Sequence, residues 1–270
     1  MRTLDGMSRP DAPTTYPPAA ARTDDVAPVP RRIRGRLGGR TIFDTTRARY
    51  VWEWSHYPQY YVPRDDVDPE VLVDEGVRHR GRRGTVQVHG LQVGGHHRPG
   101  AAQVIVDSTL EGVADTVRFD WGALDAWYEE DEEVFVHPRN PYVRVDAVRS
   151  SRHVQVRLGD LVLGESFSPV LVFETGLPTR FYLPAADLRH EYLTRSTDTE
   201  TACPYKGTTS YYLSARRAGT SEAAGDAADN SVVPDVAWCY SFPTAAVAPI
   251  AGLVAFFPDK VDVLVDGQKV

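Results

Sequence analysis

Short runs in which apolar and polar residues alternate occupy most of the chain. The segments HVQVRL (153–158), VLVFE (170–174) and VDVLVD (261–266) are rich in β-branched and aromatic residues, and Gly, Pro or Asp separates them from their neighbours. A Gly-Asp pair lies between two such runs in RLGDLVL (157–163), which is typical of a hairpin. Short strands at this spacing, without long helices between them, predict antiparallel sheets rather than βαβ units.

Two stretches carry a helical pattern instead. PAADLRHEYL (184–193) opens with a proline and spaces its apolar residues for about two helical turns. In FDWGALDAWYEEDEE (119–133), Leu124, Trp127 and Tyr128 stand at i, i+3 and i+4, which predicts a short amphipathic turn. We therefore expect a mainly β protein with a few short helices.

An internal repeat sets the domain organisation. Residues 36–72 align with residues 157–193 without a gap, and among the identical positions are the pairs Glu53/Glu174 and Tyr61/Tyr182. The match resumes where RGRRGT (80–85) aligns with CPYKGT (203–208). We predict a disordered leader over residues 1–30, a first repeat over 31–146 and a second over 147–270.

Composition narrows the classes of partner. The formal net charge is −7, which argues against nucleic acid, and no apolar run in the leader is long enough for a membrane span. Two cysteines cannot build a disulfide framework, and no set of Cys and His has the spacing of a structural zinc site. These features predict a cytoplasmic protein with no metal and no cofactor. A homodimer is compatible with these features.

Four motifs together resemble a known family. They are residues 129–156, ETGLPTRFYLP (174–184), CPYKG (203–207) and residues 251–267, and they are similar to the tandem form of the domain of unknown function 427, which also carries a nucleotidyltransferase-type label. The resemblance implies a β-tent fold, in which two antiparallel sheets lean together over a pocket, as in methionine-sulfoxide reductases and the ligand-binding domain of cereblon. It implies no reaction. The paired zinc cysteines and the resolving thiol of those relatives are absent, and no Gly-Ser motif with spaced carboxylates supports nucleotidyl transfer.

The recurring acidic and aromatic positions are the first site candidates. Glu53 and Glu174 each fall within an apolar strand, where a carboxylate either faces a pocket or turns to solvent at the strand end. Tyr61 and Tyr182 each precede a shared proline by two residues, so that their hydroxyls either orient a ligand or tie a loop to the sheet. In the acidic run EEDEE (129–133), the alternatives are a solvated face or a carboxylate paired with His137 or Arg139.

The pair Cys203 and Lys206 is specific to the second repeat, because Arg80 and Arg83 replace it in the first. A neighbouring ammonium favours a thiolate, so Cys203 is either a nucleophile or a small half-buried residue. No histidine lies nearby in sequence, so a general base would have to come from a distant part of the chain, such as Glu174.

The leading hypothesis is a protein that binds a small organic ligand in the pocket of the second repeat. The predicted lining is Glu174, Arg180, Tyr182, Cys203, Lys206, Tyr211 and Trp238, with Glu53 and Tyr61 as the counterparts in the first repeat. One alternative is an enzyme in which Cys203 attacks the substrate, Lys206 lowers the pKa of its thiol and Glu174 assists. Another is a scaffold whose first repeat serves mainly to pack on the second.

Overall fold

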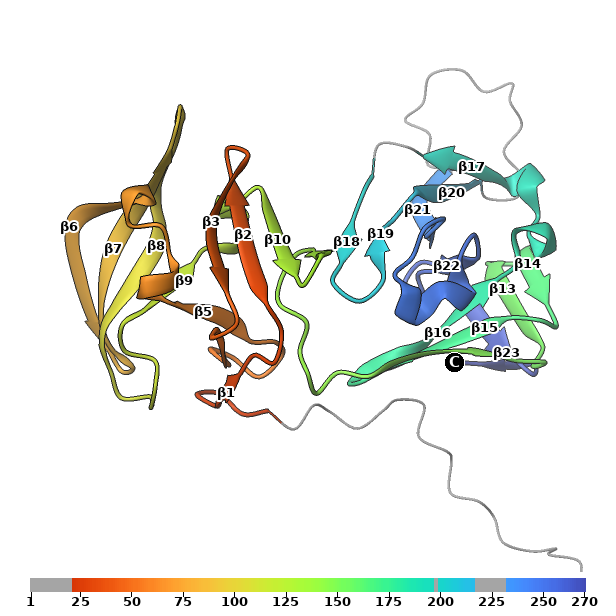
Figure 1. Ribbon diagram of the computed structural model, residues 1–270. Coiled ribbons are helices and arrows are strands. Elements are labelled where there is room, and N and C mark those ends of the chain that lie inside the picture. The colour runs from red at the N-terminus through yellow and green to blue at the C-terminus, as the bar shows by residue number, and fades with distance from the viewer. Residues whose placement is uncertain (1–20, 197–198, 217–231) are drawn as a thin grey trace, which may run out of the picture. The chain divides into compact units, whose positions relative to one another are not determined.

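A computed structural model describes residues 21–196, 199–216 and 232–270 of the chain (Figure 1). These residues divide into two compact units. The N-terminal unit runs to Tyr142 and also includes Ala202–Pro204, and the C-terminal unit comprises Val143–Thr201 and Tyr205–Val270. Each unit contains two antiparallel sheets, so the predicted mainly β class with two similar halves is confirmed. Among the described residues, no helix has the length and apolar character needed to cross a bilayer.

The N-terminal unit consists of a seven-stranded and a four-stranded sheet. The order of the larger sheet is β1 (Val26–Pro28), β4 (Arg49–Val51), β5 (Gln59–Pro63), β9 (Thr116–Phe119), β8 (His96–Ser108), β7 (Gly84–Val93) and β6 (Leu72–Gly81). The order of the smaller sheet is β11 (Glu132–Val134), β10 (Ala126–Glu129), β2 (Ile33–Leu37) and β3 (Arg40–Thr45). Three 3₁₀ turns connect strands, namely η1 (Arg64–Asp66), η2 (Pro69–Val71) and η3 (Trp121–Ala123).

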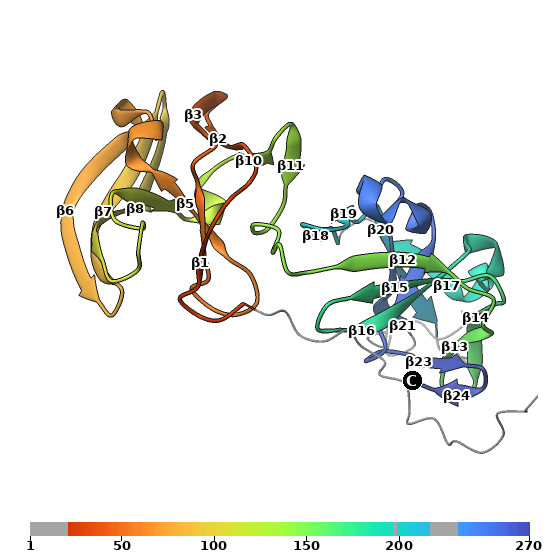
Figure 2. The same cartoon turned by 60° about the horizontal axis from the view of Figure 1, so that its bottom comes forward.

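The C-terminal unit repeats this plan. The order of its larger sheet is β12 (Val145–Arg149), β15 (Val170–Glu174), β16 (Leu177–Leu183), β22 (Val254–Phe256), β21 (Val232–Cys239), β20 (Tyr211–Arg216) and β17 (Leu193–Ser196). In the smaller sheet, which Figure 2 shows next to the C-terminus, the order is β14 (Leu161–Ser166), β13 (Val154–Leu158), β23 (Asp262–Val265) and β24 (Gln268–Lys269). The remaining elements of this unit are the short strand β19 (Gly207–Thr208) and the 3₁₀ turns η4 (Ala185–Asp187), η5 (His190–Tyr192) and η6 (Ala245–Ile250), whereas the short strand β18 (Ala202–Cys203) groups with the N-terminal unit.

Local sequence explains the corresponding hairpins of the two units. Gly159, with φ of +60°, begins the two-residue turn between β13 and β14, as the Gly-Asp pair predicts. Gly38 and Gly39 form the turn at the corresponding place between β2 and β3, where both residues have a positive φ, +57° and +78°. Each hairpin also contains a bulge at the equivalent place, directly before Arg36 in one and before Arg157 in the other.

The alternation of side chains along each strand separates two apolar clusters in the N-terminal unit. Tyr60 and Val62 of β5 pack with Ile33 and Trp127 of the smaller sheet, in the core that the two sheets share. Tyr61 belongs to a second cluster, with Val51, Ile105 and Val113. The second cluster therefore lies on the face of the seven-stranded sheet that is turned away from the smaller sheet.

Three expectations about local structure need correction. Leu124, Trp127 and Tyr128 do not share a helical turn, because Trp127 and Tyr128 lie in strand β10 and only η3 precedes them. The stretch 184–193 forms the separate 3₁₀ turns η4 and η5 instead of one helix. Within the predicted leader, residues 1–20 lie outside the described residues, but Val26–Pro28 forms β1 and pairs with β4, so this part belongs to the fold.

Candidate functional site

A pocket of about 380 Å³ lies on the outer face of the seven-stranded sheet in the N-terminal unit. Its residues come from β5 to β9, from the loop after β4 and from the loop that joins β8 to β9. The apolar part of its lining is Val86, Ile105, Leu110 and Val113. The volume is within the range typical of small-molecule sites.

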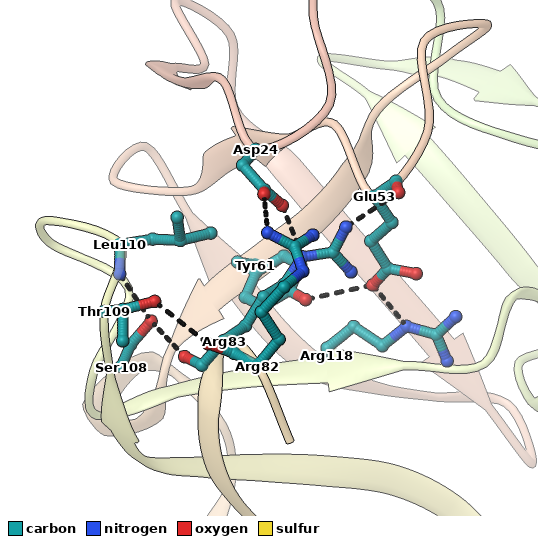
Figure 3. A network of polar contacts seen from close by, with 9 residues as sticks. All are labelled: Asp24, Glu53, Tyr61, Arg82, Arg83, Ser108, Thr109, Leu110 and Arg118. Atoms are coloured by element: carbon teal, nitrogen blue, oxygen red, sulfur yellow. Dashed lines mark hydrogen bonds and ion pairs between the residues drawn. The ribbon is translucent and has the colours of Figure 1, made fainter.

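Two arginines at the turn between β6 and β7 share one carboxylate at this pocket. Arg82 pairs with Asp24, and Arg83 donates from Nε to Oδ1 of Asp24 at 2.6 Å, as Figure 3 shows. Hydrogen bonds from Arg82 and then Arg83 lower the pKa of Asp24 below its ordinary value. Asp24 therefore stays ionised at neutral pH, and the two guanidinium groups exceed its charge by one.

The loop after β8 holds this turn in place. Ser108 donates from Oγ to the main-chain oxygen of Arg83 at 3.1 Å, and the amide of Thr109 donates to the same oxygen at 3.0 Å. The amide of Leu110 donates in turn to Oγ of Ser108 at 3.0 Å (Figure 3). These bonds fix the backbone from which Arg82 and Arg83 extend.

Glu53 forms the acidic side of the pocket. Its Oε1 accepts a hydrogen bond from the hydroxyl of Tyr61 at 2.9 Å and another from Nε of Arg118 at 3.2 Å, and its main-chain oxygen accepts from Nη2 of Arg83 at 2.7 Å. Burial, followed by the charge of Glu53, raises the pKa of Tyr61, so this phenol keeps its proton and donates it. Burial alone would lower the pKa of Arg118, but Glu53 and Asp120 more than offset that effect and raise it.

Arg80 extends the basic side of the pocket at the exposed end of β6. In the part of the chain that the structure describes, Arg80 has no ion-pair partner. Arg118, in contrast, is engaged by both Glu53 and Asp120. The positive charge that is free to meet a ligand therefore lies beside β6.

In the C-terminal unit, aromatic side chains occupy the corresponding face. In the N-terminal unit, Arg118 on β9 pairs with Tyr61 of β5 on one side and with Gln103 of β8 on the other. In the C-terminal unit, Ala255 on β22 pairs with Tyr182 of β16 on one side and with Trp238 of β21 on the other. Trp238 donates from its indole nitrogen to the hydroxyl of the fully buried Tyr182 at 3.2 Å. Trp238 thus takes the place of Gln103, and an alanine takes the place of Arg118.

Glu174 and Lys206 are brought together as a buried ion pair. Glu174, at the end of β15, is 8% exposed, and Nζ of Lys206 donates to its Oε2. In the first unit the equivalent Arg83 instead bonds the main chain of Glu53 and the carboxylate of Asp24. The acid and the cation recur in both units, but only the C-terminal unit joins their side chains directly.

The other predicted lining residues are spread over different surroundings. Arg180 lies over the ring of Trp238 at 5.9 Å, whereas Tyr211 lies under Arg195 at 4.2 Å. Burial, and then Cys239, raises the pKa of Tyr211 to about 12. Cys203 is half-buried and groups with the N-terminal unit, although Glu174 and Lys206 belong to the C-terminal unit. Among the described residues, no cluster of three or more His, Cys, Asp or Glu is placed to hold a metal ion.

Sequence reasoning selected Glu53 and Tyr61 but missed the basic residues around them. Arg80, Arg82 and Arg83 lie in the stretch that aligns with the cysteine motif of the second repeat and carries no recognisable site motif of its own. One usable signal was present, because a cation stands at both Arg83 and Lys206 while an acid stands at both Glu53 and Glu174. Asp24 and Arg118 could not be found in this way, since each reaches the pocket from a distant strand or loop.

One family model matches most of the chain, over residues 25–130 and 146–267, and its description is domain of unknown function (DUF427). The two matched segments correspond to the two halves that the repeat indicates, so the predicted family and its tandem arrangement are confirmed. No curated protein matches the chain.

Proposed function

Because the chain belongs to the family of the domain of unknown function 427, which carries no assigned reaction, we propose a function from the pocket itself. The N-terminal unit binds a small organic anion on the outer face of its seven-stranded sheet. The observation that supports this proposal most directly is the group of Arg80, Arg82 and Arg83 at one side of a pocket with an apolar lining.

Charge supports an anionic ligand. The whole chain carries a formal net charge of −7, so three arginines around a single pocket are a local concentration of positive charge. Arg82 and Arg83 share only Asp24, and Arg80 is unpaired among the described residues. A carboxylate or phosphate on the ligand would find guanidinium donors with the fork geometry that suits it.

The apolar lining supports an organic ligand rather than a bare inorganic ion. Ile105 and Val113 belong to the buried cluster beneath the pocket, and Val86 and Leu110 pack against it. A carbon skeleton placed there gains the hydrophobic contribution of about 25 cal/mol per Å² of apolar surface removed from water. The ligand is therefore expected to combine an anionic group with an apolar body.

The proposal places the ligand in the first repeat, whereas the sequence hypothesis placed it in the second. The direct ion pair of Lys206 with Glu174, and the bond of Trp238 to Tyr182, support this change because they neutralise the charges and engage the indole donor there. The role of Cys203 as a nucleophile stays a prediction. Titration of its reactivity against pH tests it, since a pKa near 8.5 would leave no activated thiol.

Ligand-observed NMR on the full chain tests the proposal. The probes are butanoate, hexanoate, octanoate and hexyl phosphate. The variant Arg80→Gln removes the unpaired guanidinium and should weaken binding by about tenfold, in line with the loss of one charge-assisted contact. Arg98→Gln is the control, because Arg98 is an exposed arginine on β8 outside the pocket lining.

A second variant tests the position of the site. Gln103→Trp places in the first unit the residue that occupies the same register position in the second, and it should abolish binding by filling the pocket. Arg80 is exposed, so Arg80→Gln remains informative even if Gln103→Trp fails to fold. The proposal is wrong if none of the four probes binds, or if a folded Gln103→Trp variant binds them as well as the native chain does.

A further inference from the structure

We infer that the ligand is bifunctional, with a hydrogen-bond donor such as an amine or hydroxyl at the end of its carbon skeleton opposite the anionic group. This inference rests on the proposed function and concerns the part of the pocket that faces the arginines. There the side chain of Glu53 is only 14% exposed and lines the pocket.

The two oxygens of Glu53 have different surroundings. Oε1 already accepts from both the hydroxyl of Tyr61 and Nε of Arg118. Oε2 accepts no hydrogen bond from any residue that the structure describes, as Figure 3 also shows for the residues drawn there. Oε2 is not among the described buried side-chain atoms that lack a partner, so it is open to solvent, and a donor on a ligand in the pocket that Glu53 lines can replace water there.

Two groups of charged side chains around the pocket differ in net sign. The carboxylates of Glu53 and Asp120 share the guanidinium of Arg118, so these three side chains carry a net negative charge, and Arg83 approaches only the main-chain oxygen of Glu53. Near the turn of β6 and β7, the single carboxylate of Asp24 is shared by Arg82 and Arg83, so positive charge is in excess. A ligand with an anion at one end and a cationic or hydroxyl donor at the other complements both sides.

The apolar residues of the pocket complete the description of the ligand class. Val86, Ile105, Leu110 and Val113 offer no donor or acceptor from their side chains, so they suit an unbranched or compact hydrocarbon segment. A plain fatty acid of the same length would place a methyl group against Oε2 of Glu53. A site built to bond a polar group discriminates strongly against an analogue that lacks it.

Matched pairs of straight-chain acids test this inference. The pairs are butanoate with 4-aminobutanoate, hexanoate with 6-aminohexanoate and octanoate with 8-aminooctanoate, and 6-hydroxyhexanoate adds an uncharged donor. Affinities are measured for the full chain by ligand-observed NMR titration. For at least one length, the amino or hydroxy acid should bind roughly tenfold more tightly than the plain acid, because only it supplies a donor to Oε2.

The variant Glu53→Gln should remove the preference for the amino acid while the plain acid binds at least as well as before. Glu111→Gln is the matched control, because Glu111 is an exposed carboxylate in the neighbouring loop outside the lining. If plain and amino acids bind the native chain equally at every length, or if Glu53→Gln keeps the preference, the inference is wrong although the proposed function stands. If no acid of either kind binds, the inference is wrong, and the proposed function fails as well if hexyl phosphate does not bind.

Discussion

Glu129 is the acidic residue whose removal should have the largest effect on the N-terminal unit. It lies at the end of β10 with a side chain that is only 2% exposed. Its Oε1 accepts from the hydroxyl of the buried Tyr60 at 2.5 Å, and its Oε2 pairs with Arg31. Glu132, in the same acidic run, has a side chain that is 68% exposed and lies 3.2 Å from Arg139. The two carboxylates therefore differ mainly in burial.

The expected cost of Glu129→Leu follows from these contacts. The substitution keeps the volume but leaves the hydroxyl of Tyr60 buried without an acceptor, which costs about 1–3 kcal/mol. Arg31 also loses its partner, but its side chain is half exposed, so solvent limits that loss to about 1 kcal/mol or less. We expect a total destabilisation of about 3 kcal/mol. Glu132→Gln should cost about 0–1 kcal/mol, as for other exposed pairs.

Urea unfolding followed by tryptophan fluorescence measures both values. Four of the five tryptophans (Trp52, Trp54, Trp121 and Trp127) fall in the N-terminal unit, and Trp121 stacks on Trp127 with ring centroids 4.7 Å apart. The signal therefore reports mainly the unit that contains Glu129.

A double-mutant cycle with Tyr60→Phe separates the hydrogen bond from other effects of the substitution. In the Tyr60→Phe background the hydroxyl that donates to Glu129 is already absent, so Glu129→Leu should cost only about 1 kcal/mol. Two results would refute the reasoning. One is an equal effect of Glu129→Leu and Glu132→Gln in the native background, and the other is an unchanged cost of Glu129→Leu once Tyr60 is a phenylalanine.

Three further predictions concern other parts of the chain. Lys206→Ala leaves the carboxylate of Glu174 buried without its partner and should destabilise the C-terminal unit by about 3–5 kcal/mol. Urea unfolding followed by circular dichroism measures this cost, and a value below about 1 kcal/mol would contradict the burial of the pair. Gly84→Ala should destabilise the N-terminal unit by about 2 kcal/mol or more, because Gly84 has φ of +125° and a Cβ there would lie 2.1 Å from the main-chain oxygen of Asp107. Gly81→Ala is the control, because its Cβ would meet no atom within 4 Å, and it should change stability by less than about 1 kcal/mol. Burial, and then the charge of Glu129, raises the pKa of Tyr50 to about 12, so the folded state holds this proton more tightly than the unfolded state does. The contribution of Tyr50 to stability should therefore be lost as the pH rises from 10 to 12, by up to about 1.4 kcal/mol per pH unit. Tyr50→Phe should remove this part of the pH dependence in urea midpoints measured over that range.

The strands could be predicted from sequence because their signal is local. Alternation, β-branched residues and glycine turns are visible within a few residues, and the repeat showed that the same plan occurs twice. The helical reading of residues 119–133 failed for a long-range reason. In β10, Trp127 and Glu129 are the buried positions, and a buried glutamate looks like a polar surface residue in the sequence. Its partners Arg31 and Tyr60 are 98 and 69 residues away, and its nearer partner Arg139, 3.6 Å from Oε2, does not by itself distinguish Glu129 from the exposed acids of the same run.

The candidate site was only partly predictable for a related reason. Glu53 and Tyr61 recur at matching positions of an alignment without gaps, and the structure joins them by a hydrogen bond. The residues that distinguish the two units lie beyond that alignment, where loop lengths differ. Gln103 and Trp238 become comparable only through the strand register, in which each faces the strand that pairs with β5 or β16. The unit in which the pocket lies therefore depends on sheet pairing, which short motifs do not reveal.

The different use of the same acid and cation in the two units gives the duplication a physical meaning. When Lys206 binds Glu174 directly, each charge neutralises the other within the buried pair. When Arg83 turns to Asp24 and to the main chain of Glu53, the side chain of Glu53 stays available with one oxygen unbonded, and the guanidinium groups stay in excess on the other side. These charges are themselves paired, Glu53 with Arg118 and Asp24 with two arginines, but the pairs are unequal and leave charge uncompensated at the pocket. A ligand that carries groups of both signs can compensate this charge, so binding is favoured in the unit whose acid is not closed onto the equivalent cation.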